Sequence, residues 1–295
     1  MTSVGGRARR VLDIRRRPAL LLLAVLAVPT AVFASALLRE VIALDPAAAA
    51  LLILLTAGVA ALLVALVGLL AGGVIPRAAS AAALVWGALA APTVAAPADG
   101  MWGETLASIL AGSPDSGWAA ALSAGPVEET IKLLGVALVA VGWPGSIRGA
   151  RSGLVAGILV GIGFGGIEDA LYLAIPIQVG ANDGFGAVGW IFLAREVASG
   201  LFLHAAFTGI AGATLGWALG GASALRWAGV CGGLAIAILL HVLANAGPMM
   251  PPDLPWTPDE LPSLAANALV RSVPIAVVCW LLVRLRPRRV ARTER

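Results

Sequence analysis

Long apolar runs separated by short polar segments are the dominant pattern along this chain. Runs of roughly 20 residues recur from Pro18 to Leu285, and about 20 apolar residues are what an α-helix needs to cross a bilayer. The runs are continuous and lack the alternation of a membrane strand, so helices are favoured over a barrel. We expect about eight membrane helices, at residues 18–38, 47–71, 78–98, 118–142, 152–179, 196–220, 227–247 and 264–285.

The charged residues between the runs indicate how the helices are oriented. With the N-terminus in the cytoplasm, 16 of the 20 basic residues fall in cytoplasmic loops or tails, whereas the outer loops are mainly acidic. Basic residues concentrate on the cytoplasmic side of membrane proteins. The pattern therefore predicts that both termini are cytoplasmic. Residues 18–38 exceed the apolar part of a signal peptide, so we expect an uncleaved first helix.

Composition excludes a soluble protein and changes how the net charge is interpreted. The 295 residues are 60% hydrophobic and 12% charged. The net charge of +4 does not indicate a nucleic-acid partner, because membrane orientation explains the basic residues. We expect one integral membrane domain over residues 1–295, multi-pass in a cell membrane and surrounded by the lipid bilayer. The bias toward Arg, Ala and Gly is typical of a GC-rich bacterial genome.

Ten polar residues stand out inside four consecutive apolar runs, where each charged side chain costs about 2.5–3.5 kcal/mol. The helical rise per residue puts one residue of each run about 10–16 Å below the outer surface. These residues are Glu128, Glu168, His204 and His241. Eight of the ten form i,i+4 pairs, each on one helix face. The pairs are Glu128/Lys132, Glu168/Tyr172, His204/Thr208 and His241/Asn245, and the other two residues are Glu129 and Asp169. We predict that they converge in a four-helix core, residues 118–248, in the outer half of the membrane.

Glycines in the fifth run predict how two of these helices pack. Gly153, Gly157, Gly161 and Gly165 repeat at four-residue spacing. Small residues at this spacing let membrane helices approach closely. We therefore expect this face of the fifth helix to contact a neighbour.

The histidines and carboxylates allow three kinds of chemistry. The two histidines, which are the only ones in the chain, can hold a divalent metal with carboxylates and activate water. Without metal, a carboxylate can act as general base while other groups stabilise an oxyanion. The same residues can relay protons or ions in a transporter, although no proline breaks the runs beside them and no internal symmetry is visible. A non-catalytic scaffold that binds a partner helix is a further alternative.

Four segments, in this order on consecutive runs, resemble the PrsW-type intramembrane proteases, which are distant relatives of the CAAX-prenyl-protease and bacteriocin-processing (CPBP) membrane proteases. They are PVEETIKLL (126–134), GFGGIEDALY (163–172), HAAFTGIAG (204–212) and HVLAN (241–245). One departure is Asp169, where the family pattern usually has asparagine. The resemblance implies an intramembrane endopeptidase that cuts a membrane-anchored protein, such as an anti-sigma factor, on the outer side.

The resemblance also implies roles for individual residues. Glu128 and Glu129 would include the base that activates water. His204 and His241 would bind a metal or the oxyanion, and Asn245 would support the oxyanion. With Glu168 as a third, catalytic carboxylate, the two histidines match the ligand types of a His₂Glu zinc site. CPBP relatives have been argued to use glutamate without metal, so zinc and a metal-free mechanism both stay open.

Overall fold

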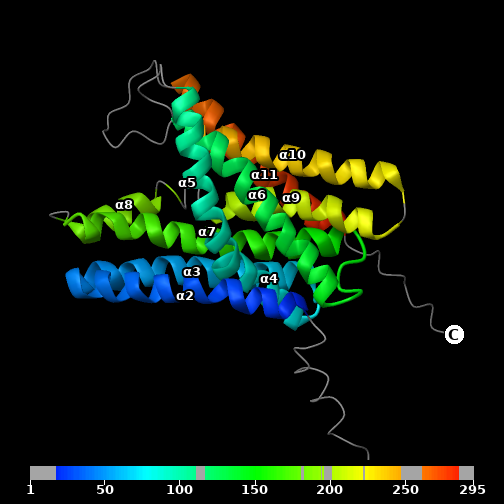
Figure 1. The fold of residues 1–295 in the computed structure, drawn as a ribbon, viewed down its shortest axis with the longest axis horizontal. Coiled ribbons are helices and arrows are strands. Elements are labelled where there is room, and N and C mark those ends of the chain that lie inside the picture. The colour runs from blue at the N-terminus through cyan, green and yellow to red at the C-terminus, as the bar shows by residue number, and fades with distance from the viewer. Residues whose placement is uncertain are drawn as a thin grey trace, which may run out of the picture.

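Helices account for nearly all of the structure, which confirms the predicted all-α fold. The computed structural model describes residues 18–110, 117–180, 183–193, 195, 201–221, 223–246 and 261–285, and these ranges contain no strand. The helices are α2 (Pro18–Leu44), α3 (Pro46–Ala71), α4 (Arg77–Val85), η2 (Trp86–Ala90), α5 (Ala91–Ile109), α6 (Gly117–Gly142), α7 (Ala150–Gln178), α8 (Gly184–Phe192), α9 (Leu201–Leu219), α10 (Ala224–Ala246) and α11 (Leu261–Arg284). In Figure 1, α2, α3 and α7 run along the long axis and α5 crosses them steeply.

The predicted runs coincide with these helices, with two clear differences. The third run continues past its predicted end to Ile109, and the short helix α8 was not predicted. Within the described residues, five helical segments are long and apolar enough to cross a membrane: α2, α3, Arg77–Ile109, α7 and α10. α6 is not among them, and it carries three charged side chains near its middle. The count of eight spans and the cytoplasmic position of both termini stay predictions.

The third run contains a local widening of the helix that contacts α6. α4 passes through the π-helical turn η2 into α5. Pro92, just after this turn, has no N–H to donate to the preceding turn, which favours such a widening. Within the turn, the buried Trp86 donates its indole N–H to the Ile131 carbonyl of α6 at 3.1 Å. This bond attaches η2 to α6 one residue before Lys132.

The closest helix packing is between α7 and α9, which share the most extensive contact in the structure. Glycines make this approach possible, as the sequence predicted. A Cβ atom added at Gly157 would overlap the Thr208 carbonyl oxygen, and one at Gly161 would overlap the His204 carbonyl oxygen. The backbone that carries His204 therefore lies directly against α7.

We expect Gly161→Ala to destabilise the protein by about 1–3 kcal/mol, because the new methyl group would push the His204 backbone away from α7. Gly166→Ala, on the same helix, is the matched control. Its Cβ would meet only Ala60, at 4.0 Å, so it should unfold at the parental temperature or slightly above. Thermal unfolding in detergent measures both variants, and equal stability of the two would contradict this account of the packing.

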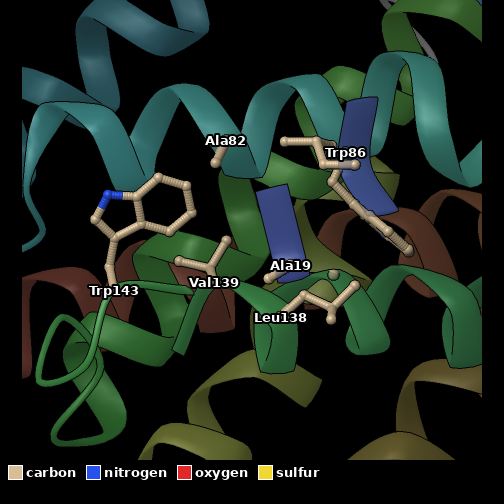
Figure 2. Close-up of a pocket in the computed structure, with 8 residues that line it drawn as sticks. Ala19, Ala82, Trp86, Leu138, Val139 and Trp143 are labelled. Carbon is tan, nitrogen blue, oxygen red and sulfur yellow. The ribbon is translucent and has the colours of Figure 1, made fainter. Parts of the chain in front are cut away.

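An apolar pocket lies between α2, α4, η2 and α6, away from the charged residues of α6 (Figure 2). Trp86 and Trp143 form two of its walls, and Ala19 and Val139 lie between them. None of the lining residues is charged. It therefore offers no group for acid–base or metal chemistry.

Candidate active site

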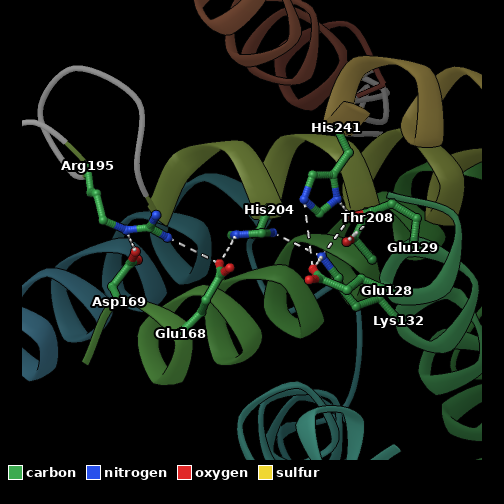
Figure 3. A network of polar contacts seen from close by, with 9 residues as sticks. All are labelled: Glu128, Glu129, Lys132, Glu168, Asp169, Arg195, His204, Thr208 and His241. Atoms are coloured by element: carbon green, nitrogen blue, oxygen red, sulfur yellow. Dashed lines mark hydrogen bonds and ion pairs between the residues drawn. The ribbon is translucent and has the colours of Figure 1, made fainter. Parts of the chain in front are cut away.

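Four helices bring polar side chains together inside the protein (Figure 3). The His204 and His241 rings meet edge to face, with their centroids 5.1 Å apart. Both histidines are buried. Seven of the ten residues that the sequence grouped thus converge on one place. They are Glu128, Glu129 and Lys132 from α6, Glu168 from α7, His204 and Thr208 from α9, and His241 from α10.

Glu129 lies at the fully buried end of this network, and both of its oxygens accept hydrogen bonds. Lys132 Nζ donates to Oε1 at 2.7 Å, and His241 Nδ1 donates to the same oxygen at 3.0 Å. The Thr208 hydroxyl donates to Oε2 at 3.0 Å. Because an ionised carboxylate only accepts, His241 Nδ1 carries the proton. Glu129 therefore orients His241 and leaves its Nε2 facing Glu128.

Glu128 is the adjacent residue, but its carboxylate has a different environment. Its Oε2 lies 3.1 Å from Lys132 Nζ and 3.8 Å from His241 Nε2. The first distance is that of an ion pair, yet the angles do not make a hydrogen bond, and this buried oxygen has no hydrogen-bond partner among the described residues. A buried polar atom in this condition is costly. Glu128 Oε2 is therefore the atom of the network best placed to contact a ligand.

His204 is oriented by a carboxylate in the same way as His241. Its Nε2 lies 2.5 Å from Glu168 Oε2, and its Nδ1 lies 2.9 Å from Lys132 Nζ. An ammonium group only donates, so Nδ1 accepts and Nε2 donates its proton to Glu168. The site therefore holds two carboxylate–histidine pairs. Each pair turns the second ring nitrogen toward the region of Glu128.

Arg195 joins the network from the connection between α8 and α9, and the sequence did not identify it as a site residue. Its Nη2 lies 3.4 Å from Glu168 Oε2, and its Nε donates to Asp169 Oδ1 at 3.1 Å. One signal could have found it, because it is among the four basic residues that fall outside the predicted cytoplasmic segments. Those four are Arg39, Lys132, Arg195 and Arg271.

Three of the side chains fit a metal site. Glu128, His204 and His241 each offer one ligand atom, and these atoms lie within 4.8 Å of one another. Imidazole and carboxylate are ligand types of zinc, and carboxylates commonly hold the second nitrogen of metal-bound histidines. With neutral histidines, four carboxylates face two cations, and this excess of negative charge suits a divalent ion. The charged residues are Glu128, Glu129, Glu168, Asp169, Lys132 and Arg195.

Two residues proposed from the sequence are not members of this group of three, although one of them, Glu168, contacts it. Glu168 was proposed as the carboxylate ligand, but it binds the Nε2 side of His204, and Glu128 completes the group instead. Asn245 is exposed on α10, one turn after the buried His241. The ligand role of Glu168 and the oxyanion role of Asn245 stay predictions.

Comparison with known proteins gave one result that bears on this site. The model of a family described as PrsW family intramembrane metalloprotease matches residues 75–279. The matched region covers about two thirds of the chain and includes all four helices that form the network. No curated protein and no solved structure matches the chain.

Proposed function

Because the chain belongs to the PrsW family of intramembrane metalloproteases, we propose that the network on α6, α7, α9 and α10 is its hydrolytic centre. One observation carries this assignment. Glu128 Oε2 makes no hydrogen bond to the described residues and lies beside two histidines. Glu129 accepts from Nδ1 of His241, and Glu168 accepts from Nε2 of His204. The family match supports a membrane-embedded hydrolase that acts on protein, and it does not favour a transporter or a non-catalytic scaffold.

We assign the metal site to Glu128 Oε2, one nitrogen of His204 and one nitrogen of His241. The ligand types favour zinc. When bound, such an ion polarises a peptide carbonyl and makes water more acidic. Glu129 and Glu168 keep the imidazoles oriented by accepting the proton on the opposite ring nitrogen. This arrangement leaves His241 Nε2 and His204 Nδ1 unprotonated, and Lys132, which donates to His204 Nδ1, must release that nitrogen before it can bind an ion.

Glu128 is also the group placed to move a proton. Both oxygens of Glu129 are occupied by protein donors, whereas one carboxylate oxygen of Glu128 can bind the ion while the other accepts a proton from water. Glu129 is then a positioning residue, and Lys132 offsets the charge of the two glutamates. A metal-free mechanism would use the same Glu128 carboxylate as the base, and metal content distinguishes the two.

The substrate that we propose is a membrane-anchored protein, of the anti-sigma-factor type that the sequence resemblance implies. The depth of the polar residues in the sequence supports a cut in the outer half of the membrane. Exposure supports an approach from one end of the network, because the Glu168 and Arg195 side chains are 22% and 20% exposed while Glu129 is fully buried. A peptide can therefore reach the site from the Glu168 end.

Cleavage of a single-pass test protein in liposomes tests this function. We expect the purified protein to cut the test protein, and mass spectrometry of the fragments should place the cut in the outer half of its membrane segment. A test protein whose segment is lengthened by one turn on the outer side should be cut about four residues farther from its cytoplasmic end, because the site lies at a fixed depth below the outer surface. Cuts confined to the cytoplasmic half, or ion flux without any cleavage, would contradict the proposal.

A further inference from the structure

Arg195 occupies the more exposed end of the polar network and binds two carboxylates at once (Figure 3). Its Nη2 lies 3.4 Å from Glu168 Oε2, and its Nε donates to Asp169 Oδ1 at 3.1 Å. Its guanidinium also lies over the Tyr172 ring, 3.6 Å from the centroid. All three contacts come from adjacent turns of α7, so the guanidinium plane is held from three directions.

Glu168 needs such support to keep its orientation. Its side chain is 22% exposed, whereas Glu129, the carboxylate that orients the other histidine, is fully buried and accepts from three donors. Glu168 Oε2 accepts from His204 and contacts Arg195. Without the guanidinium, this partly exposed carboxylate would be less constrained and could turn toward its surroundings. Arg195 thus gives Glu168 the constraint that burial gives Glu129.

We propose that Arg195 is a positioning residue, held in place by Asp169 and Tyr172. It fixes Glu168 against His204 Nε2 and so keeps the imidazole ring oriented with Nδ1 toward the centre of the site. Of the two neutral forms of His204, the one protonated at Nε2 is selected by Lys132, which donates to Nδ1, together with Glu168, which accepts from Nε2. Asp169 takes part through Arg195 and does not itself touch the histidine. The assignment rests on the proposed active site, but the orientation of His204 can be measured without proteolysis.

The chemistry requires arginine in particular. A guanidinium presents several N–H groups in one plane, so it can bind Asp169 through Nε and Glu168 through Nη2 while it stacks on Tyr172. A lysine ammonium is a point charge on a flexible chain and cannot reproduce these three contacts together. Arg195→Lys should therefore behave more like Arg195→Gln than like the parent protein.

Nitrogen NMR of the histidines gives the direct test. The chain has two histidines, so metal-free protein labelled with ¹⁵N-histidine, and purified through a tag without histidine, gives four ring-nitrogen signals. In the spectrum of His241→Gln, the two remaining signals are those of the His204 ring nitrogens. We expect the parent to show His204 protonated at Nε2 alone. Because Lys132 still donates to Nδ1 in the variants, we expect Arg195→Gln and Arg195→Lys to keep this form but to show a displaced Nε2 signal, since the bond to Glu168 is loosened.

Two further variants serve as controls. Asp169→Asn keeps an oxygen that accepts from Arg195 Nε, so it should retain the parental His204 signals. Arg226→Gln removes another arginine that stacks on an aromatic ring, Trp217, and binds a backbone carbonyl, but it lies outside the polar network. It should also leave the His204 signals unchanged, even where it lowers thermal stability.

Kinetics with the single-pass test protein provide the second readout. Loss of a residue that orients a catalytic group typically costs about tenfold to a hundredfold, and we expect this loss in kcat for Arg195→Lys with KM changed less than about twofold. A folded Arg195→Gln protein with the parental His204 signals would overturn the proposal. Arg195 would then serve only to attach the α8–α9 connection to α7. If Arg195→Gln does not fold, parental signals in Arg195→Lys overturn it equally. Absence of cleavage in every protein contradicts only the proposed function.

Discussion

Replacing Glu128 by glutamine should abolish proteolysis in a protein that still folds, whereas replacing Glu129 by glutamine should reduce both activity and stability. We expect Glu128→Gln to lower kcat at least about a hundredfold, the range found when a general base or its equivalent is removed. Its unfolding temperature should fall less than that of Glu129→Gln, because Glu128 loses one ion pair with Lys132 while its Oε2 makes no hydrogen bond to the described residues.

Glu129 should respond differently because its carboxylate is fully committed to protein partners. Lys132, His241 and Thr208 all donate to it, and breaking a buried ion pair from one side costs about 3–5 kcal/mol. Glutamine has the same shape, but it cannot neutralise the ammonium of Lys132. We therefore expect Glu129→Gln to unfold at a clearly lower temperature than Glu128→Gln.

Thermal unfolding and cleavage of the single-pass test protein, measured on the same preparations, separate the two glutamates. Glu104→Gln is the matched control, because Glu104 is an exposed glutamate on α5 and should keep parental activity and stability. The role assignment would be reversed if Glu129→Gln were stable and inactive while Glu128→Gln were active.

Removing divalent metal should inactivate the protein reversibly. Purified protein should contain about one zinc ion per chain, lose it to a chelator together with its activity, and regain both when zinc is added back. His204→Ala and His241→Ala should each lose the bound ion, because each removes one of three proposed ligands. Full activity in a preparation shown to be free of metal would leave the glutamate mechanism, with Glu128 as the base.

The two carboxylates near His204 should differ in the same measurement. Glu128→Ala removes a proposed ligand and should abolish stoichiometric binding. Glu168→Ala removes the partner of His204 Nε2 and should only weaken zinc binding, by about tenfold to a hundredfold. Competition with a coloured chelator measures both affinities. The opposite order would favour Glu168 as the ligand, as the sequence pattern had suggested.

The sequence by itself determined the class of the protein, the positions of its main helices and the residues that gather at its site. Apolar runs specify membrane-length helices because helix formation and hydropathy are properties of consecutive residues. The cost of burying charge made Glu128, Glu168, His204 and His241 conspicuous in those runs. Helical rise gave them a common depth before any contact between helices was known.

Only the tertiary structure decided which partners each of these residues contacts. Glu128 and Glu129 have the same depth but point about 100° apart around α6, and the packing of α6 against α9 and α10 determines which of them is enclosed by donors. The same packing leaves Asn245 exposed although it follows His241 by one turn. Arg195 reaches Asp169 across 26 positions of sequence, and no local pattern encodes a contact of that range. The path of the chain through α8 brings it there, and that path depends on how the helices pack.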